Sequence, residues 1–384
     1  MKKLPQKLKT KLEIRIQNNA FRTLSLPNDL IDFYSNDYLG FAKLDIIFDK
    51  THQLLIDNDL KNNGATGSRL ISGNFDLYQE TEHFIAQFHE SAAALIFNSG
   101  YDANIGFFGA VPQRDDFIFF DELSHASIRD GISMSNAKSY KFNHNDFEDL
   151  EEKIIRVTIN KKSEKAIVYV VTESVFSMDG DCPNLEKLVR VTEKYNCNLV
   201  IDEAHALGVF GEKGQGLVQE LGLQDKVFAR IMTFGKGLGC HGAAIIGSQE
   251  LKDYLINFAR SFIYTTGLSP HSVATILTAY QQLSQDETQI KRLRENIIFF
   301  NQQKNLLSLK PIFIRSKSAI QSAVIPGNEN VKRVAKIIQE NGFNVKPILS
   351  PTVPEGQERL RICLHNHDNK QHITQILNLI LNSL

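Results

Sequence analysis

The sequence predicts an α/β fold, in which helices cover both faces of a mainly parallel sheet and a smaller α+β domain follows. Between about residue 90 and residue 250, short runs of β-forming residues alternate with helical stretches. After Pro270 a long helical pattern leads into shorter mixed segments that end at 360–362. We therefore predict an N-terminal segment (1–45), a large domain (46–270) and a small C-terminal domain (271–384).

The N-terminal segment is expected to hold one helix and one short strand. Leu4, Leu8 and Leu12 recur at helical spacing among lysines, which predicts an amphipathic helix that lies on the body with its basic face in solvent. A strand-like stretch follows at 30–36, and the turn formers up to Gly40 end it.

Six strand-like runs form the predicted large sheet, at 94–97, 117–120, 166–171, 199–201, 229–233 and 243–246. Open α/β sheets bind ligands outside the carboxyl ends of their strands. Polar residues follow the first five runs directly, among them Asn98, His125, Glu173, Asp202 and Lys236. We expect one cleft to collect these residues.

Charge, hydropathy and cysteine content exclude several classes of protein. A net charge of -1 lacks the excess of basic residues that is typical of nucleic-acid-binding proteins. No run approaches the ~18 apolar residues of a membrane span, and the first residues lack the apolar core of a signal peptide, so we expect a cytoplasmic protein without membrane association. The spacing of the four cysteines predicts inert thiols and no metal site: Cys182, Cys197, Cys240 and Cys363.

Lys236 stands between two glycines just after the fifth run. A lysine on so short a turn has no apolar surface for its stem, so we predict a buried and reactive amine. A phosphate-binding lysine of a P-loop is disfavoured because the preceding residues, 230–234, lack the first glycine of that motif. A structural surface lysine is the remaining alternative.

Asp202 and His205 lie three residues apart at the end of the fourth run. Asp202 is expected to need a cationic partner there, either a pyridinium nitrogen or a protein arginine. His205 would reach the phenolic oxygen of the same ligand, or else cap a turn. With Lys236, these groups suit pyridoxal 5'-phosphate, which needs an amine for its Schiff base, a carboxylate at its ring nitrogen and donors for its phosphate.

Further residues are candidates for the cofactor and the substrate. Gly100-Tyr101 precedes a predicted helix, where backbone amides would approach a phosphate, and Ser177 and Thr233 would add hydroxyl donors. His125 would stack on the pyridine ring, although a single loop histidine is more often structural. Arg361, in an alternating run, is either a clamp for a substrate carboxylate or an exposed strand arginine.

One set of motifs spans nearly the whole chain: Asn-Asp-Tyr-Leu-Gly at 36–40, Gly-Ser-Arg-Leu-Ile-Ser-Gly at 67–73, Asp-Glu-Leu-Ser-His-Ala-Ser at 121–127, Thr-Glu-Ser-Val-Phe-Ser-Met-Asp-Gly-Asp at 172–181, Asp-Glu-Ala-His at 202–205 and Thr-Phe-Gly-Lys-Gly at 233–237. These motifs resemble those of the α-oxoamine synthases. The resemblance implies the aspartate-aminotransferase-like fold (PLP fold type I) and a condensation of an amino acid with an acyl thioester that releases carbon dioxide. Segments 68–70, 318–321 and 351–356 favour the member that joins L-alanine to a pimeloyl thioester.

Carried over to this sequence, the resemblance assigns the cofactor contacts. It implies that Lys236 holds the cofactor covalently, that Asp202 pairs with the ring nitrogen and that His205 contacts the phenolic oxygen. It also implies that His125 stacks on the ring and takes part in catalysis. The phosphate would be held by the groups named above: Gly100, Tyr101, Ser177 and Thr233.

The resemblance also assigns the substrate side and the assembly. Asn36 and Arg361 would face the substrate, and Arg22 matches an N-terminal substrate-binding arginine. The loop Thr265-Thr266 resembles one that reaches the cofactor of the other subunit, which implies a homodimer with shared sites. Cys363 departs from the family pattern, since a threonine is usual at this substrate position, and Cys240-His241 replaces smaller residues.

Three alternatives stay open at this stage. A sister synthase would use glycine or serine with another acyl-CoA and share every cofactor residue. An aminotransferase would share the lysine and the aspartate. A catalytically silent partner subunit is the third alternative, although Lys236, Asp202 and His205 together disfavour it. The acyl donor would be carried by coenzyme A or by an acyl carrier protein.

Overall fold

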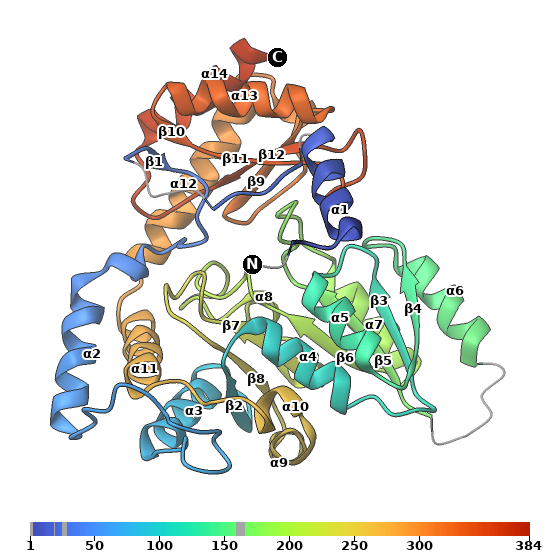
Figure 1. Cartoon of the computed structure of the whole chain (residues 1–384), viewed down its shortest axis with the longest axis vertical. Coiled ribbons are helices and arrows are strands. Elements are labelled where there is room, and N and C mark those ends of the chain that lie inside the picture. Colours follow the sequence, from blue (N-terminus) through green and yellow to red (C-terminus); the bar gives the residue numbers. More distant parts are fainter. Residues whose placement is uncertain (1–2, 19, 25–28, 159–165) are drawn as a thin grey trace.

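The computed structural model describes residues 3–18, 20–24, 29–158 and 166–384. In these residues the chain forms a larger body around one sheet and a smaller body around a second sheet (Figure 1). Lys2, one of the lysines in the predicted N-terminal helix, lies outside the described residues.

The large sheet has seven strands in the order β2-β8-β7-β6-β5-β3-β4. Their bounds are β2 Ala93–Phe97, β3 Phe117–Asp121, β4 Lys138–Phe142, β5 Val168–Glu173, β6 Asn198–Asp202, β7 Ala229–Thr233 and β8 Ala243–Gly247. Five neighbouring strands, β4, β3, β5, β6 and β7, run parallel to one another, whereas β8 is antiparallel to both β7 and β2. The predicted, mainly parallel sheet is therefore confirmed.

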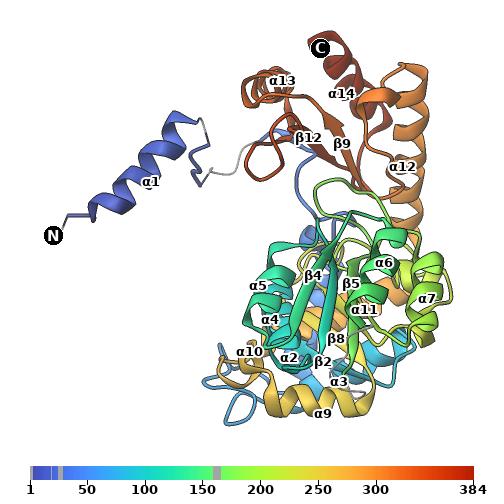
Figure 2. The same cartoon turned by 90° about the vertical axis from the view of Figure 1, so that its right-hand side faces the viewer.

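The interior strands are buried along nearly their whole length and are mostly apolar, because both faces of the sheet are covered. One face carries α4 (Gly100–Ala110), α5 (Ala126–Met134), α9 (Gln249–Phe258) and α10 (Arg260–Ile263). The other carries α3 (Asp76–Phe88), α6 (Phe147–Thr158), α7 (Leu185–Lys194) and α11 (Pro270–Gln285). Figure 2 shows α4 and α5 on one side of the strands and α6 and α7 on the other. Successive residues of one strand, such as Leu95 and Ile96, point to opposite faces of the sheet and so belong to different hydrophobic cores.

The strand β4 was not predicted from the sequence. It lies at the edge of the sheet and pairs only with β3, and most of its residues are exposed or half-buried. Edge strands carry lysines and other polar residues that protect the open edge from pairing with another chain. Lys138 and Lys141 give β4 this composition. The strand therefore lacks the continuous apolar run by which the buried strands were predicted.

The smaller body is built on a three-stranded antiparallel sheet in the order β11-β12-β9. Its strands are β9 Ile320–Val324, β11 Lys346–Ile348 and β12 Arg359–Cys363, and its helices are α12 Thr288–Leu306, α13 Asn328–Glu340 and α14 Lys370–Ser383. β1 (Ile31–Asp32) pairs in parallel with β10 (Phe343–Asn344), so this short strand joins the smaller body. The predicted smaller α+β domain is confirmed.

Further elements lie within these bodies or between them. They are α2 Asp45–Asp57, α8 Leu217–Glu220 and the 3-10 turns Phe41–Lys43, Gln224–Lys226 and Lys310–Ile312. The helix α11 packs against α2 and α3 on the large body, so its contacts favour a division after Gln285. The predicted domain limits at 45 and 270 stay a proposal. None of the described helices is long and apolar enough to cross a membrane.

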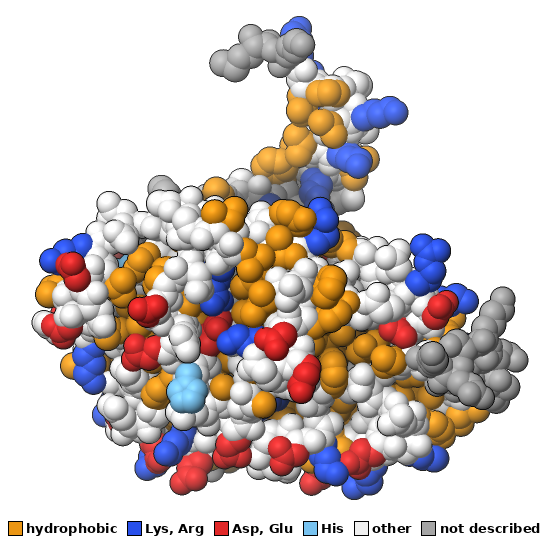
Figure 3. Space-filling model, turned by 90° about the horizontal axis from the view of Figure 1, so that it is seen from below, with side chains coloured by type: hydrophobic (Ala, Val, Ile, Leu, Met, Phe, Trp, Pro, Cys, Tyr) orange, Lys and Arg blue, Asp and Glu red, His pale blue; other side chains and the backbone are white. Residues whose placement is uncertain are grey.

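The N-terminal helix α1 (Gln6–Gln17) forms, but it does not lie on the body as predicted. It stands away from the rest of the chain (Figure 2), and none of its residues is buried. Figure 3 shows it as a projection on which hydrophobic and basic side chains are mixed. At 100° per residue, its apolar residues from Leu8 to Ile16 spread over roughly 200° of the circumference, too wide for one contact face.

Candidate active site

The carboxyl ends of β5, β6 and β7 meet the N-terminus of α4 around a cavity of about 190 Å³. Seven residues that the sequence singled out line this cavity: Gly100, Tyr101, His125, Asp202, His205, Thr233 and Lys236. Asn104, Ser127, Glu173 and Ala204 complete the lining. Of the strand-end residues expected in one cleft, His125, Glu173, Asp202 and Lys236 line this cavity, whereas Asn98 does not.

Lys236 lies in the tight connection between the antiparallel strands β7 and β8. Gly237 is required there, because a side chain at this position would meet the carbonyl oxygen of Leu207 at 2.3 Å. The amine points into the cavity, where Nζ lies 2.9 Å from Nε2 of His205. Loss of contact with water lowers the pKa of Lys236, while the nearby carboxylates of Asp202 and Glu173 oppose that effect. These are the surroundings of a reactive amine.

Asp202 is a buried carboxylate at the end of β6. It accepts hydrogen bonds from the Ala204 amide at 2.9 Å and from Nδ2 of Asn104 at 2.9 Å. It forms no ion pair with any residue that the structure describes, and the nearby Arg230 pairs with Glu203 instead. The alternative of a protein arginine as its partner is therefore wrong for this part of the chain. A buried carboxylate in this state favours a cationic ligand.

His205 is buried between Lys236 and Tyr38, whose hydroxyl lies 2.7 Å from Nδ1. Burial, and then the positive charge of Lys236, lower the pKa of His205 well below its ordinary value. The ring is therefore neutral, with one N–H and one lone pair. A turn-capping role is not seen, because both ring nitrogens contact side chains of the site.

His125 begins α5 and lies at the mouth of the cavity. Its Nδ1 accepts from the Ser127 amide at 3.2 Å and lies 2.7 Å from the Ser127 hydroxyl. Ser127 in turn accepts from Nδ2 of Asn104 at 3.1 Å, which ties His125 to Asp202. Because Nδ1 acts as the acceptor, the N–H of the neutral ring is at Nε2. Partial burial lowers the pKa of His125.

Glu173 supports the same loop from the end of β5. One of its oxygens accepts from the His125 amide at 2.6 Å. Burial, together with the charge of Asp202, raises the pKa of Glu173 to about 8. The carboxyl is therefore largely protonated at neutral pH, which limits the negative charge around Asp202.

The N-terminus of α4 offers free backbone amides to the cavity, since the first N–H groups of a helix have no partner within it. Ser99 caps this helix by accepting from the Asp102 amide at 3.0 Å. A side chain at Gly100 would meet Oγ1 of Thr233 at 2.5 Å, so only glycine leaves the space between helix and strand open. The result is a cradle of amides and a hydroxyl that suits an anion.

Arg361 reaches the site from β12 of the smaller body. Its Nη2 donates to Oδ1 of Asn36 at 2.8 Å, and the Tyr38 hydroxyl donates to the same oxygen at 3.2 Å. The Nε of Arg361 is buried and has no hydrogen-bond partner among the described residues. This unused donor fits a carboxylate ligand. The alternative of an exposed strand arginine is wrong, because Arg361 is 7% exposed.

Ser177 lines a second cavity of about 240 Å³ that shares His125 with the first. Apolar side chains such as Phe176, Met178 and Val353 line this second cavity. Its rim is also contacted by Arg22, whose Nη2 donates to Oγ1 of Thr352 at 3.4 Å. Ser177 therefore lies beside the Lys236 cavity and not in it.

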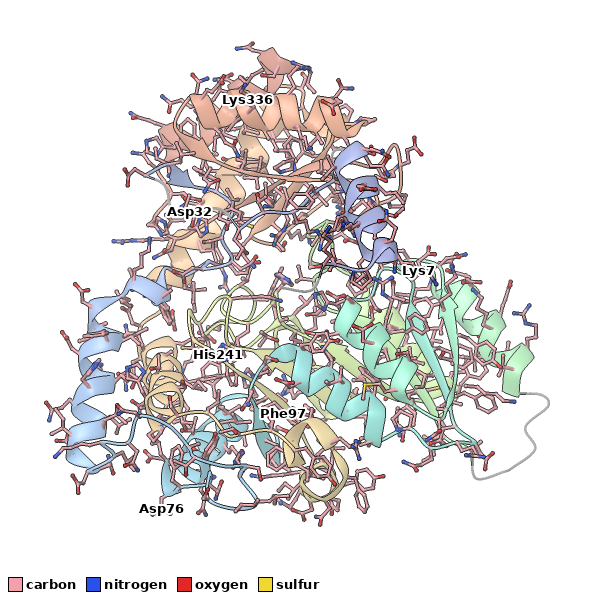
Figure 4. The ribbon with its side chains drawn as sticks, in the orientation of Figure 1. Lys7, Asp32, Asp76, Phe97, His241 and Lys336 are labelled. Atoms are coloured by element: carbon pink, nitrogen blue, oxygen red, sulfur yellow. The ribbon has the colours of Figure 1, made fainter. Side chains whose placement is uncertain are left out.

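Three other candidate positions lie outside both cavities. The thiol of Cys363 is buried, on the same face of β12 as Arg361. The loop Thr265-Thr266 is held by Asn98, whose Nδ2 donates to the Thr266 carbonyl at 2.7 Å. His241 is exposed in the connection from β7 to β8 and lies near the centre of Figure 4.

Sequence reasoning gave no role in the site to Tyr38, Asn104, Ser127 or Glu173, although it expected Glu173 in the cleft. Asn104 carried a signal, because it is a polar residue inside the apolar run of α4. Buried polar side chains need partners, so its position already favoured a role near a charged group. Glu173 carried the same kind of signal at the end of a buried strand.

The residues present fit pyridoxal phosphate. Asp202 offers a buried carboxylate, and Gly100 with Thr233 leaves an open cradle at a helix N-terminus. Lys236 supplies the amine between them. These features match the carboxylate, the phosphate donors and the amine that this cofactor requires.

Known proteins are similar to this chain in sequence and in fold. Residues 28–377 match the family of class I and II aminotransferases. A relative from Emericella nidulans, named 8-amino-7-oxononanoate synthase, is 38% identical over 368 residues, which are 92% of this chain and 89% of the relative.

Two solved structures extend the comparison. The crystal structure of 8-amino-7-oxononanoate synthase from Francisella tularensis has a TM-score of 0.76 and 29% identity, and the match covers 93% of this chain and 98% of that one. A serine palmitoyltransferase from Sphingomonas wittichii has a TM-score of 0.88 and 25% identity, with 98% and 96% covered. This chain therefore belongs to the class I and II aminotransferase family, within the α-oxoamine synthases, a family of pyridoxal-phosphate enzymes with the aspartate-aminotransferase-like fold.

Proposed function

We propose that the protein is an acyltransferase of biotin biosynthesis that condenses L-alanine with a pimeloyl thioester. The products would be 8-amino-7-oxononanoate, carbon dioxide and a free thiol. The observation that carries the proposal is the cavity lined by both the Lys236 amine and the buried Asp202 carboxylate. The relative from Emericella nidulans, 38% identical over most of both chains, supports this choice of substrates.

The cavity residues would hold pyridoxal phosphate in one orientation. Lys236 would bind its carbonyl carbon, Asp202 its protonated ring nitrogen and His205 its phenolic oxygen. The amides of Gly100 and Tyr101, with the Thr233 hydroxyl, would hold its phosphate. When bound, the cofactor supplies an electron sink for the negative charge that develops at the Cα atom of the amino acid.

The chain's own residues would then move the protons and orient the substrates. Arg361 would bind the alanine carboxylate through its free Nε, and the Lys236 amine would take the proton from Cα. A carbon–carbon bond would form between Cα and the thioester carbonyl as the thiolate leaves. The Nε2–H of His125 would stabilise the oxygen of that carbonyl. Loss of carbon dioxide and return of a proton from Lys236 to Cα would complete the reaction.

The second cavity is our proposed site for the acyl chain. It meets the Lys236 cavity at His125, where the thioester carbonyl would react, and its side chains Phe176, Met178 and Val353 suit a methylene chain. Ser177 would then contact the acyl thioester more closely than the phosphate predicted from the sequence. Arg22, at the rim through Thr352, keeps its proposed role on the substrate side.

A homodimer that acts in the cytoplasm is part of the same proposal. We infer that Thr266 reaches the cofactor of the other subunit, since within one chain its loop lies outside the Lys236 cavity. The four free thiols support a reducing compartment.

A sister synthase that uses serine is a second candidate. Its support is the TM-score of 0.88 to the serine palmitoyltransferase from Sphingomonas wittichii and the unusual Cys363 beside Arg361.

The test is release of free thiol from pimeloyl-coenzyme A by the cofactor-loaded protein, with L-alanine, glycine or L-serine as the amino acid. Release with L-alanine alone, together with carbon dioxide, is the expected result. Release with serine or glycine alone would favour a sister synthase. Amino-group exchange with a keto acid and no thiol release would identify an aminotransferase. If pimeloyl-coenzyme A releases no thiol with any amino acid, the assay is repeated with a pimeloyl acyl carrier protein as the acyl donor. Failure of both donors would refute the proposal.

A further inference from the structure

A buried line of hydrogen bonds runs from Lys236 to the smaller body. Nζ of Lys236 lies 2.9 Å from Nε2 of His205, and Nδ1 of that ring lies 2.7 Å from the Tyr38 hydroxyl. The hydroxyl lies 3.2 Å from Oδ1 of Asn36, which Arg361 holds at 2.8 Å. Tyr38 is completely buried, so solvent does not supply another partner.

The neutral His205 ring has one N–H but a close partner at each nitrogen. Two arrangements satisfy both contacts. When Lys236 is an ammonium, it donates to Nε2, Nδ1–H donates to the Tyr38 oxygen, and the Tyr38 hydroxyl donates to Asn36. When Lys236 is a neutral amine, Nε2–H donates to the amine, and the Tyr38 hydroxyl turns to donate to Nδ1.

We propose that Tyr38 is a positioning residue whose rotating hydroxyl lets His205 exchange tautomers, so that Lys236 keeps a hydrogen bond both as an ammonium and as an amine. The inference deepens the proposed function, on which it rests, because Lys236 must pass from ammonium to amine before it can capture the cofactor. Tyr38 itself touches neither Lys236 nor the reacting atoms and acts through His205.

The surroundings of Tyr38 suit this role. Burial raises the pKa of Tyr38 far above its ordinary value, so it remains a phenol that both donates and accepts. Asn36 offers a fixed acceptor, because Arg361 already holds its Oδ1. A phenylalanine would fill the same space but would lack the hydroxyl.

Other charged groups around Lys236 remain in place in either arrangement. Asp202 and Glu173 face it from β6 and β5, Arg361 faces it from β12, and His125 lies across the cavity from it. They set the midpoint at which Lys236 loses its proton. Of these groups, Arg361 also contacts the Tyr38 hydroxyl, so the ¹⁵N-histidine measurement described below separates the tautomer exchange from that contact.

Tyr38→Phe should lower the pKa of Lys236. In the variant, the ammonium arrangement leaves a buried Nδ1–H without an acceptor, whereas the amine arrangement leaves only an unfilled lone pair. Unpaired buried N–H groups are the rarer and more costly of the two. We expect a downward shift of about one pH unit, or a tenfold change in the ratio of ammonium to amine.

The experiment follows the pH dependence of pyridoxal-phosphate capture by the cofactor-free full chain, from the Schiff-base absorbance after mixing. The capture rate depends on the fraction of neutral Lys236. Tyr38→Phe should move the midpoint down while keeping the rate at high pH within a few fold. Tyr280→Phe is the matched control, since Tyr280 is equally buried and contacts a buried histidine, His89, at 3.0 Å outside the site. An unchanged midpoint in Tyr38→Phe, even with a uniformly slower rate, would overturn the proposal.

A measurement on the unmodified chain covers the case in which Tyr38→Phe does not fold. In protein labelled with ¹⁵N-histidine, the His205 nitrogens should exchange N–H character between Nδ1 and Nε2 at the midpoint found for Lys236. One fixed tautomer across that range would overturn the proposal. Neither experiment uses alanine or a thioester, so their outcome does not depend on whether these are the substrates.

Discussion

Glu173→Gln should remove a large pH dependence from the stability of the protein. Burial raises the pKa of Glu173 from 4.5 to about 8, so the folded chain holds this proton more tightly than the unfolded chain. The resulting contribution to the free energy of unfolding is complete below pH 4.5 and is lost as the pH rises through 8. A difference of about 3.5 pH units, at about 1.36 kcal/mol per unit, gives a contribution on the order of 5 kcal/mol.

Glutamine tests this contribution because it keeps the shape of the side chain and carries no charge at any pH. It retains an oxygen that accepts from the His125 amide. Urea denaturation at pH 5, 7 and 9 would give the free energy of unfolding of both proteins. We expect equal values at pH 5 and a variant more stable than the wild type by several kcal/mol at pH 9. Glu152→Gln, at an exposed position, is the control. Stability curves that run parallel at all three pH values would refute the reasoning.

Three predictions concern the proposed reaction. Lys236→Ala should abolish both the Schiff-base absorbance and thiol release while leaving the circular dichroism unchanged; full turnover in this variant would remove the lysine from the mechanism. Asp202→Asn should lower kcat by about 100-fold or more, since loss of one preorganised electrostatic contact costs about 3 kcal/mol; a change below threefold would show that the carboxylate does not face the cofactor ring. Arg361→Lys should raise the KM for L-alanine about tenfold, because lysine cannot bind Asn36 and also offer a second, fixed N–H to the carboxylate, and an equal rise in the KM for the thioester would count against a carboxylate clamp.

The large sheet could be predicted from the sequence because its interior strands are buried on both faces. Each then appears as a short, mostly apolar run, such as those of β3 and β5, and the run ends where the chain enters the site. The edge strand β4 lacks this signal, because only its last residue, Phe142, is buried. Strand prediction therefore succeeded where burial fixes the composition.

The residues of the candidate site also fall into those that could be predicted from the sequence and those that could not. Lys236, Asp202 and His205 belong to short local motifs at strand ends, and the structure brings them to one cavity. The contacts that complete the site join distant positions: Asn104 and Asp202 are 98 residues apart, and Tyr38 and His205 are 167 apart. Such pairs depend on how the strands and the two bodies come together. No periodicity or spacing along the chain encodes them, so they became visible only in the folded structure.

The N-terminal helix shows the limit of a periodic pattern, and it allows a direct test. Leu8 and Leu12 are 47% and 46% exposed, so replacing either by alanine should change the free energy of unfolding by less than about 0.5 kcal/mol. Leu188→Ala, at a fully buried position of α7, should instead cost about 2–5 kcal/mol. Urea denaturation at two protein concentrations measures both effects. A loss above about 1 kcal/mol for Leu8→Ala that depends on protein concentration would mean that a second copy of the chain buries this helix, since a single chain offers it no contact that such a loss would require.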